Sequence, residues 1–206
     1  MALRLAGGLL VALALAACAP ANAPTPTPAP DTGINIVEPP VAIQDFTLVN
    51  QAGQETHLAD VTGKYTLLAF GYTHCPDVCP ITLAHFKQIK ARLGDQAPQV
   101  NFVWVSVDGA RDTPERLAEY IANFDPAITG LTGAEEQVRA FITQFGGVYF
   151  LNNAGGLKKN YTVDHTASWF LLSPDGQWLR TYRYATKPEI VAQDIAALAR
   201  ARPAAG

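Results

Sequence analysis

The stretch that decides the fold runs from Tyr65 to Pro80 and reads YTLLAFGYTHCPDVCP. Its first eight residues, Tyr65–Tyr72, are almost continuously apolar and β-prone, which predicts a strand buried on both faces of a sheet. Pro80 suits the first turn of a helix, where its missing N–H costs nothing. Cys75 and Cys79 are therefore expected between a central strand and the helix that this strand feeds.

The sequence on either side alternates between predicted strands and helices. Helical spacing of apolar residues continues to Leu93, and Gly94 is typical of a helix end. The other predicted elements are an edge strand at 41–49, a short strand at 55–58, a strand at 101–107, helices at about 112–124, 132–145 and 186–200, extended pieces at 148–152 and 159–163, and strands at 168–172 and 177–184. This order predicts an α/β domain with a thioredoxin-like fold: a central mixed β-sheet flanked by helices, with an N-terminal strand extension.

The first 40 residues read as an export signal and a tether. Residues 1–17 carry one charge, Arg4, and an apolar run of 13 residues that is too short for a permanent membrane span. The run ends in Leu15-Ala16-Ala17-Cys18, which resembles a bacterial lipobox and predicts a signal peptide over 1–17 and lipidation of Cys18. Residues 18–40 are rich in proline, alanine and threonine, which favours an extended tether. The folded domain is then expected over 41–206.

Charge and composition narrow the classes of function. The chain has 15 Lys and Arg against 18 Asp and Glu, a net charge of −3. Removal of the signal peptide takes away Arg4, which leaves 14 Lys and Arg against 18 Asp and Glu, a net charge of −4. Because the sequence has no basic patch, we expect no nucleic-acid partner. With Cys18 lipidated, Cys75 and Cys79 are the remaining thiols. Met1 is the sole methionine, so the mature chain offers no thioether ligand.

Two cysteines four residues apart at a helix start can face the same way, and they can exchange electrons or hold a soft metal. Dithiol oxidoreductases on this fold normally use Cys-x-x-Cys, and the extra residue here favours a metal between the sulfurs without deciding the matter. His165 precedes a predicted hairpin strand, at the loop that lies beside the cysteines in a thioredoxin-like fold. Two thiolates and one imidazole suit copper, as Cu(I) or Cu(II), whereas zinc sites generally take a fourth ligand or a water.

The chain contains two longer motifs, Phe70-Gly71-Tyr72-Thr73-His74-Cys75-Pro76-Asp77-Val78-Cys79-Pro80 and Val163-Asp164-His165-Thr166. Together they resemble the Sco/SenC family of copper chaperones, over about residues 41–200. Ser106-Val107-Asp108 and Arg111-Asp112-Thr113-Pro114-Glu115 are similar to the family too, although Gly109 stands where the family usually has proline. The resemblance implies Cys75, Cys79 and His165 as copper ligands. It also implies delivery of copper to the binuclear CuA centre of cytochrome c oxidase subunit II, by a protein tethered to a membrane.

Two other hypotheses of function stay open. One is a thiol–disulfide oxidoreductase that uses Cys75 and Cys79 as a redox-active dithiol, which would become a disulfide bond as it reduces the CuA-site cysteines of the same target. The other is a peroxide-consuming or redox-sensing thiol protein. Whether the chain is an enzyme is therefore undecided. We expect an exported monomer, lipid-anchored on the outer face of a bacterial membrane, in the periplasm or at the cell surface, that can also exchange copper with other carriers.

Four residues near the predicted ligands have candidate supporting roles. Asp164 is a candidate for orienting His165, and Asp77 for tuning the thiolates. His74 is expected to face solvent beside Cys75. His85 is expected to pack within a helix stripe.

Overall fold

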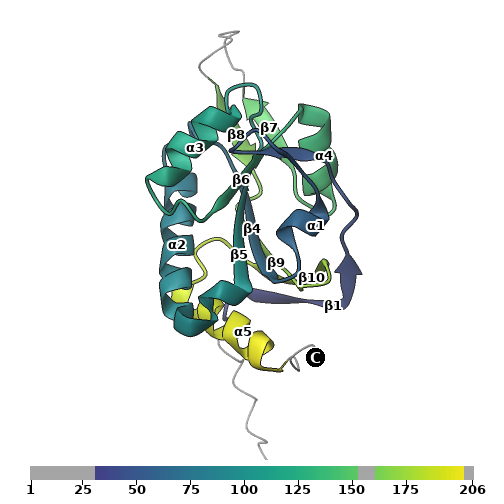
Figure 1. The fold of residues 1–206 in the computed structure, drawn as a ribbon, viewed down its shortest axis with the longest axis vertical. Coiled ribbons are helices and arrows are strands. Elements are labelled where there is room, and N and C mark those ends of the chain that lie inside the picture. Colours follow the sequence, from purple (N-terminus) through teal and green to yellow (C-terminus); the bar gives the residue numbers. More distant parts are fainter. Residues whose placement is uncertain (1–30, 153–160, 202–206) are drawn as a thin grey trace, which may run out of the picture. The chain divides into compact units, whose positions relative to one another are not determined.

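The computed structural model describes residues 31–152 and 161–201. Within them, an eight-stranded mixed sheet has the order β1-β10-β9-β4-β5-β6-β2-β3, and β7 and β8 form a separate two-stranded sheet (Figure 1). The strands are β1 Ile34–Ala42, β2 Leu48–Asn50, β3 Glu55–Thr56, β4 Tyr65–Gly71, β5 Val100–Ser106, β6 Thr129–Thr132, β7 Tyr149–Asn152, β8 Thr162–His165, β9 Trp169–Leu172 and β10 Gln177–Tyr182. The helices are α1 Leu58–Val61, α2 Val78–Leu93, α3 Pro114–Ala122, α4 Glu135–Thr143 and α5 Pro188–Ala201, with a 3-10 helix at Gly94–Gln99.

The central strand β4 pairs with β5 in parallel and with β9 antiparallel, as expected for a βαβ unit followed by a hairpin. All seven of its residues are buried. Ala69, for example, lies between Trp104 of β5 and Trp169 of β9. The prediction of a strand covered on both faces is confirmed, and so is the mixed, thioredoxin-like α/β fold.

Helices cover both faces of the large sheet, and alternation along the strands divides the aromatic core between them. Figure 1 shows α2 and α3 on one face and α1 and α4 on the other, and α2 packs against α5. Trp169 of β9 contacts Phe86 of α2, with ring centroids 5.9 Å apart. Its neighbour Phe170 points to the opposite face, where its ring centroid lies 4.8 Å from that of Phe145, just after α4. In this arrangement, α2 begins near the carboxyl end of the central strand β4.

The N-terminal boundary differs from the prediction. Strand β1 spans 34–42 and pairs with the edge of β10, and the compact unit begins at Asp31. Residues 34–40 therefore belong to the sheet and not to the tether, and the expected strand at 41–49 is divided between β1 and β2. Pro39 and Pro40 suggested a tether, but proline is tolerated in an edge strand, where the lost N–H need not be paired. Cys18 lies outside the described residues.

One strand was not predicted. The four residues of β6 pair with β5 in parallel and with β2 antiparallel, which extends the sheet beyond the central strands. Over the described part of the chain, no helix combines the length and the apolar character needed to cross a membrane.

Candidate metal centre

The loop after β4 and the first turn of α2 hold the two cysteines. The Cys75 amide donates to the Tyr72 carbonyl at 3.2 Å, which turns the chain back after the strand. Asp77 is the residue before the helix, and Cys79 lies in its first turn. Cys79 is buried and Cys75 half-buried, and both are free thiols. The structure therefore places both sulfurs at a helix N-terminus, as predicted.

His165 reaches the same place from the far part of the sequence. It is the last residue of β8, directly opposite Tyr149 of β7. Its Nε2 atom lies 3.5 Å from the Cys79 sulfur, and its Nδ1 atom lies 3.0 Å from the Thr166 carbonyl oxygen. Because a carbonyl only accepts, this contact favours a proton on Nδ1 and leaves the Nε2 lone pair facing the sulfurs.

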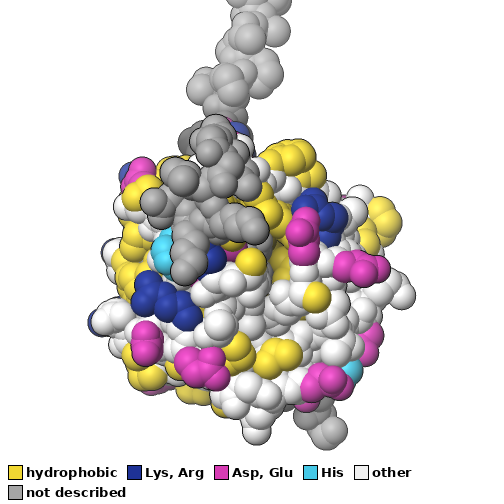
Figure 2. Space-filling model, turned by 90° about the horizontal axis from the view of Figure 1, so that it is seen from above, with side chains coloured by type: hydrophobic (Ala, Val, Ile, Leu, Met, Phe, Trp, Pro, Cys, Tyr) yellow, Lys and Arg dark blue, Asp and Glu magenta, His cyan; other side chains and the backbone are white. Residues whose placement is uncertain are grey.

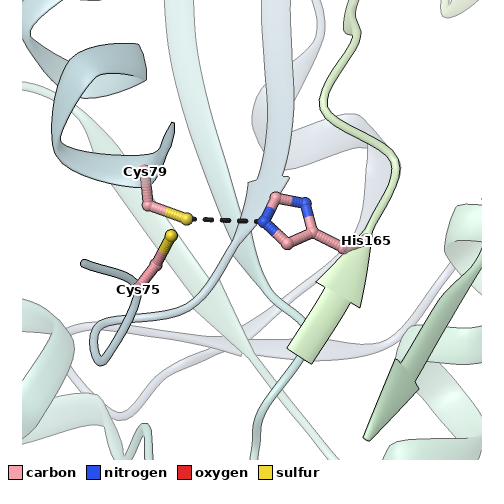
Figure 3. A group of neighbouring side chains, drawn as sticks. All are labelled: Cys75, Cys79 and His165. Atoms are coloured by element: carbon pink, nitrogen blue, oxygen red, sulfur yellow. Dashed lines mark hydrogen bonds between the residues drawn. The ribbon is translucent and has the colours of Figure 1, made fainter. Parts of the chain in front are cut away.

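The three side chains converge in Figure 3, and their ligand atoms lie within 4.8 Å of one another. Two soft sulfurs and one imidazole nitrogen form a donor set that suits copper. Cys75 and His165 are partly exposed, so one flank of the cluster is open to a partner. The adjacent sulfurs of Cys75 and Cys79 can also lose two electrons and form a disulfide bond.

The surroundings of the two thiols shift their pKa values in opposite directions. The hydrogen bond from Cys79 is the largest cause that lowers the pKa of Cys75, to about 3, against the opposing effect of burial. The backbone amides of Asp77 and Cys79 lower that pKa further. The pKa of Cys79 is raised, first by its bond to Cys75 and then by burial. At neutral pH the metal-free pair therefore holds one thiolate, on the more exposed sulfur, and one thiol.

Two residues that support the site were not assigned this role from the sequence. Asp112 is fully buried, and it accepts hydrogen bonds from the Thr73 amide at 2.8 Å, the Thr73 hydroxyl at 2.7 Å and the Ser106 hydroxyl at 2.6 Å. The sequence places it at the start of the helix predicted at about 112–124, but the capping residue of α3 is Thr113. Asp112 instead fixes the loop that leads to Cys75.

Gly71 is the second such residue. A Cβ atom there would lie 2.8 Å from both the Cys79 sulfur and the Trp104 ring. Glycine is therefore required for the close approach of α2 to β4. The sequence did contain a signal, because a glycine in an otherwise apolar strand often marks such an approach.

The predicted role of Asp164 is wrong. Successive residues of a strand point to opposite faces, so Asp164 faces away from the side on which His165 lies. It is exposed and accepts a hydrogen bond from the Asn152 side chain at 2.7 Å. The Thr166 carbonyl holds the His165 ring instead.

The structure also places the other three candidate residues, Asp77, His74 and His85. Asp77 is exposed, and the contact it makes with the Cys75 sulfur is through its backbone amide. His74 has 45% of its side chain exposed, as expected. It forms a second potential ligand cluster with Asp108 and Asp112, but those carboxylates already accept bonds from arginine, tyrosine and threonine. His85 packs against Trp169 in the core, as expected.

Strand β7 and the residue before it expose apolar side chains to solvent. Val148, Phe150 and Leu151, at β7, are 54%, 62% and 42% exposed. Figure 2 looks onto the end of the molecule that carries β7 and β8, where hydrophobic side chains lie among charges of both signs.

A thioredoxin-like fold with a dithiol and a histidine at the carboxyl end of its central strand defines a class of metal-binding or thiol-exchanging proteins. The model of the SCO1/SenC family matches residues 37–200. The chain therefore belongs to the SCO1/SenC family.

Individual relatives agree with this assignment. Protein SCO2 homolog of Bos taurus is 35% identical over 153 residues, which are 73% of this chain and 57% of the relative, so the chain spans just over half the length of that protein. The structure of Bradyrhizobium japonicum ScoI with copper bound has 34% identity and a TM-score of 0.68, over 76% of this chain and 98% of that chain. A SCO1/SenC family lipoprotein of Bacillus anthracis has 26% identity and a TM-score of 0.69, over 79% and 99%.

Proposed function

We propose that this chain is a membrane-tethered copper metallochaperone that delivers copper to the CuA centre of cytochrome c oxidase subunit II. The observation that carries the proposal is the convergence of Cys75, Cys79 and His165, with their ligand atoms within 4.8 Å. Membership of a family whose solved structures include copper-bound proteins supports copper as the cargo.

The geometry suits both capture and release of the cargo. The Cys75 thiolate is ready to bind at neutral pH, and Cys79 gives up its proton as the second sulfur engages. His165 offers Nε2 as the third donor. Because Cys75 and His165 are partly exposed, a thiolate of the recipient can reach the copper ion before this chain has released it, so copper passes by ligand exchange.

Replacement of one ligand tests the site. Reduced protein, purified in detergent, is titrated with Cu(II) and followed by absorbance and electron paramagnetic resonance. We expect a one-to-one complex with thiolate-to-copper charge transfer and mixed nitrogen–sulfur coordination. In His165→Ala, stable Cu(II) binding is expected to be lost. Wild-type affinity in that variant refutes the three-ligand site, and failure to load an apo-CuA domain refutes the delivery step.

A second candidate is a thiol–disulfide oxidoreductase that reduces the CuA-site cysteines of the same target. The lowered pKa of Cys75 beside a second thiol favours it. The Cys75 thiolate attacks the target disulfide and Cys79 then displaces the reduced target, which leaves a Cys75–Cys79 disulfide. His165→Ala spares most of this exchange, whereas it abolishes stable Cu(II) binding, so one variant separates the two functions.

The membrane tether is part of the proposal. Leu15-Ala16-Ala17-Cys18 has the form of a lipobox, and a Bacillus anthracis relative is described as a lipoprotein. We infer an exported protein with Cys18 lipidated, on the outer face of a bacterial membrane, that acts as a monomer. Globomycin blocks lipoprotein signal cleavage, so unprocessed precursor should accumulate in treated cells. Normal processing under globomycin contradicts the anchor.

A further inference from the structure

The ligand His165 lies on an element that is separate from the main sheet. Strands β7 and β8 pair only with each other among the described strands. The two cysteines, in contrast, follow directly from the central strand β4. The distance between His165 and the sulfurs therefore depends on how the β7–β8 pair is fixed to the rest of the domain.

One fixing point lies at the base of β8. The Arg111 guanidinium lies 3.6 Å from the centre of the Tyr161 ring, and its Nη1 donates to the Tyr161 carbonyl at 3.0 Å. The Tyr161 hydroxyl donates to Asp108 at 2.5 Å, and the other oxygen of that carboxylate pairs with Arg111. We name Asp108, Arg111 and Tyr161 the β8 clamp. It holds the ring, the hydroxyl and the backbone of the residue that precedes β8.

The β8 clamp is largely shielded from solvent and adjoins the site. The side chains of Arg111 and Asp108 are 13% and 1% exposed. Arg111 also lies 5.7 Å from the centre of the Tyr72 ring, and that ring meets His165 edge to face at 6.0 Å. A continuous set of contacts thus runs from the clamp to the imidazole. An ion pair shielded from water holds its geometry better than an exposed pair.

A similar arginine–tyrosine pair, between Arg139 of α4 and Tyr149 of β7, offers a matched control. Arg139 lies 4.3 Å from the centre of the Tyr149 ring, and its bond to the Tyr149 carbonyl is long, at 3.5 Å. Its side chain is 46% exposed and pairs with Glu135 on its own helix. Tyr149 is buried and its hydroxyl donates to the Glu135 carbonyl, so it stays in place without Arg139.

We propose that Asp108, Arg111 and Tyr161 are positioning residues that hold His165 against the two sulfurs. The inference rests on the proposed function in that His165 is a copper ligand. With the β8 clamp closed, the centre has three donors. With the clamp broken, β8 moves away and a two-sulfur site remains, which suits Cu(I) but not stable Cu(II). The clamp thus gives this chain a means to release one ligand without disturbing the other two.

The test compares reduced wild-type protein with Arg111→Met and Arg139→Met by Cu(II) titration and electron paramagnetic resonance. Arg111→Met is expected to lose the nitrogen coupling of His165 and about 10–100-fold in Cu(II) affinity, and to retain Cu(I) binding by the sulfurs. Arg139→Met is expected to match the wild type. A wild-type spectrum and affinity in Arg111→Met, or an equal loss in both variants, overturns the proposal.

A metal-free measurement separates this inference from the proposed function. If the wild type itself shows no nitrogen coupling, the three-ligand site has failed, and the clamp is judged by amide hydrogen exchange of the reduced protein without copper. Faster exchange in β8, but not in β9, of Arg111→Met supports the clamp, and unchanged exchange refutes it. If Arg111→Met does not fold, Arg111→Lys replaces it in both measurements, and the same outcomes decide. Lysine keeps the positive charge but cannot stack a planar guanidinium on the Tyr161 ring.

Discussion

The two cysteines lie four residues apart, one in the loop after β4 and one in the first turn of α2, and their surroundings give them different chemistry. Cys75 is half-buried and has its pKa lowered to about 3, whereas Cys79 is buried and has its pKa raised. A lowered pKa means that the thiolate is populated at every pH above about 3. The nucleophile of the pair is therefore Cys75.

Alkylation measures this difference directly. The rate of reaction of Cys75 with iodoacetamide in the metal-free, reduced protein should stay nearly constant from pH 5 to pH 8, because the thiolate is already formed. The alkylation rate of an ordinary thiol rises about tenfold per pH unit over this range. In Cys79→Ser the hydrogen bond from the second thiol changes, and the profile should become steeper. A tenfold gain per pH unit in the wild type contradicts the assignment.

Gly71 allows a second prediction at the residue scale. In Gly71→Ala the new methyl group meets the Cys79 sulfur and the Trp104 ring, which must both move. We expect the free energy of unfolding in urea to fall by about 1–3 kcal/mol, and the affinity for copper to fall with it. Gly71→Ala combined with Trp104→Phe should recover part of the stability, because the smaller ring leaves room. Additive losses in the double variant argue against this contact.

The three residues that converge at the candidate metal centre could be predicted from the sequence, but the groups that hold them in place could not. Cys75, Cys79 and His165 have side chains whose type and spacing indicate their chemistry. The Thr166 carbonyl that holds the His165 ring is a backbone atom, and any residue would supply it. The wrong role for Asp164 has the same origin, because adjacency in sequence says nothing of the strand alternation that turns it away.

At the scale of elements, α3 has a defined start. Its capping residue is Thr113, whose side-chain oxygen accepts a hydrogen bond from the Arg116 amide at 3.3 Å. Thr113→Ala should lower the free energy of unfolding by about 1 kcal/mol, measured by urea denaturation. Thr113→Ser keeps the oxygen and serves as the control. Equal losses in both variants would show that the cap contributes nothing.

The main helices were predictable from their apolar periodicity, and the central strands from their nearly continuous apolar runs. The predicted strand boundaries were wrong where the local composition and the pairing of strands in the folded domain disagree. Strand β1 contains two prolines and was read as tether, yet pairing with β10 brings it into the sheet. Strand β6 has four residues and includes Gly130, too little for a periodic signal, and it forms because β5 and β2 lie on either side of it.

At the scale of the molecule, the proposed copper ligands Cys79 and His165 are 86 residues apart in sequence and come from different elements. A metal that binds only the folded state raises the free energy of unfolding, by about 4 kcal/mol at a thousand times its dissociation constant. Thermal unfolding of the reduced protein should therefore shift upward by roughly 8–16 °C with copper. The oxidised protein lacks both thiolates and should shift little. Equal shifts in the two redox states contradict this coupling.

The outermost strand β1 has a further consequence. A free sheet edge is a template on which a second copy of the chain can add a strand. Pro39 and Pro40 have no N–H to donate to an incoming strand. The two prolines that conceal β1 in the sequence thus protect this edge against aggregation.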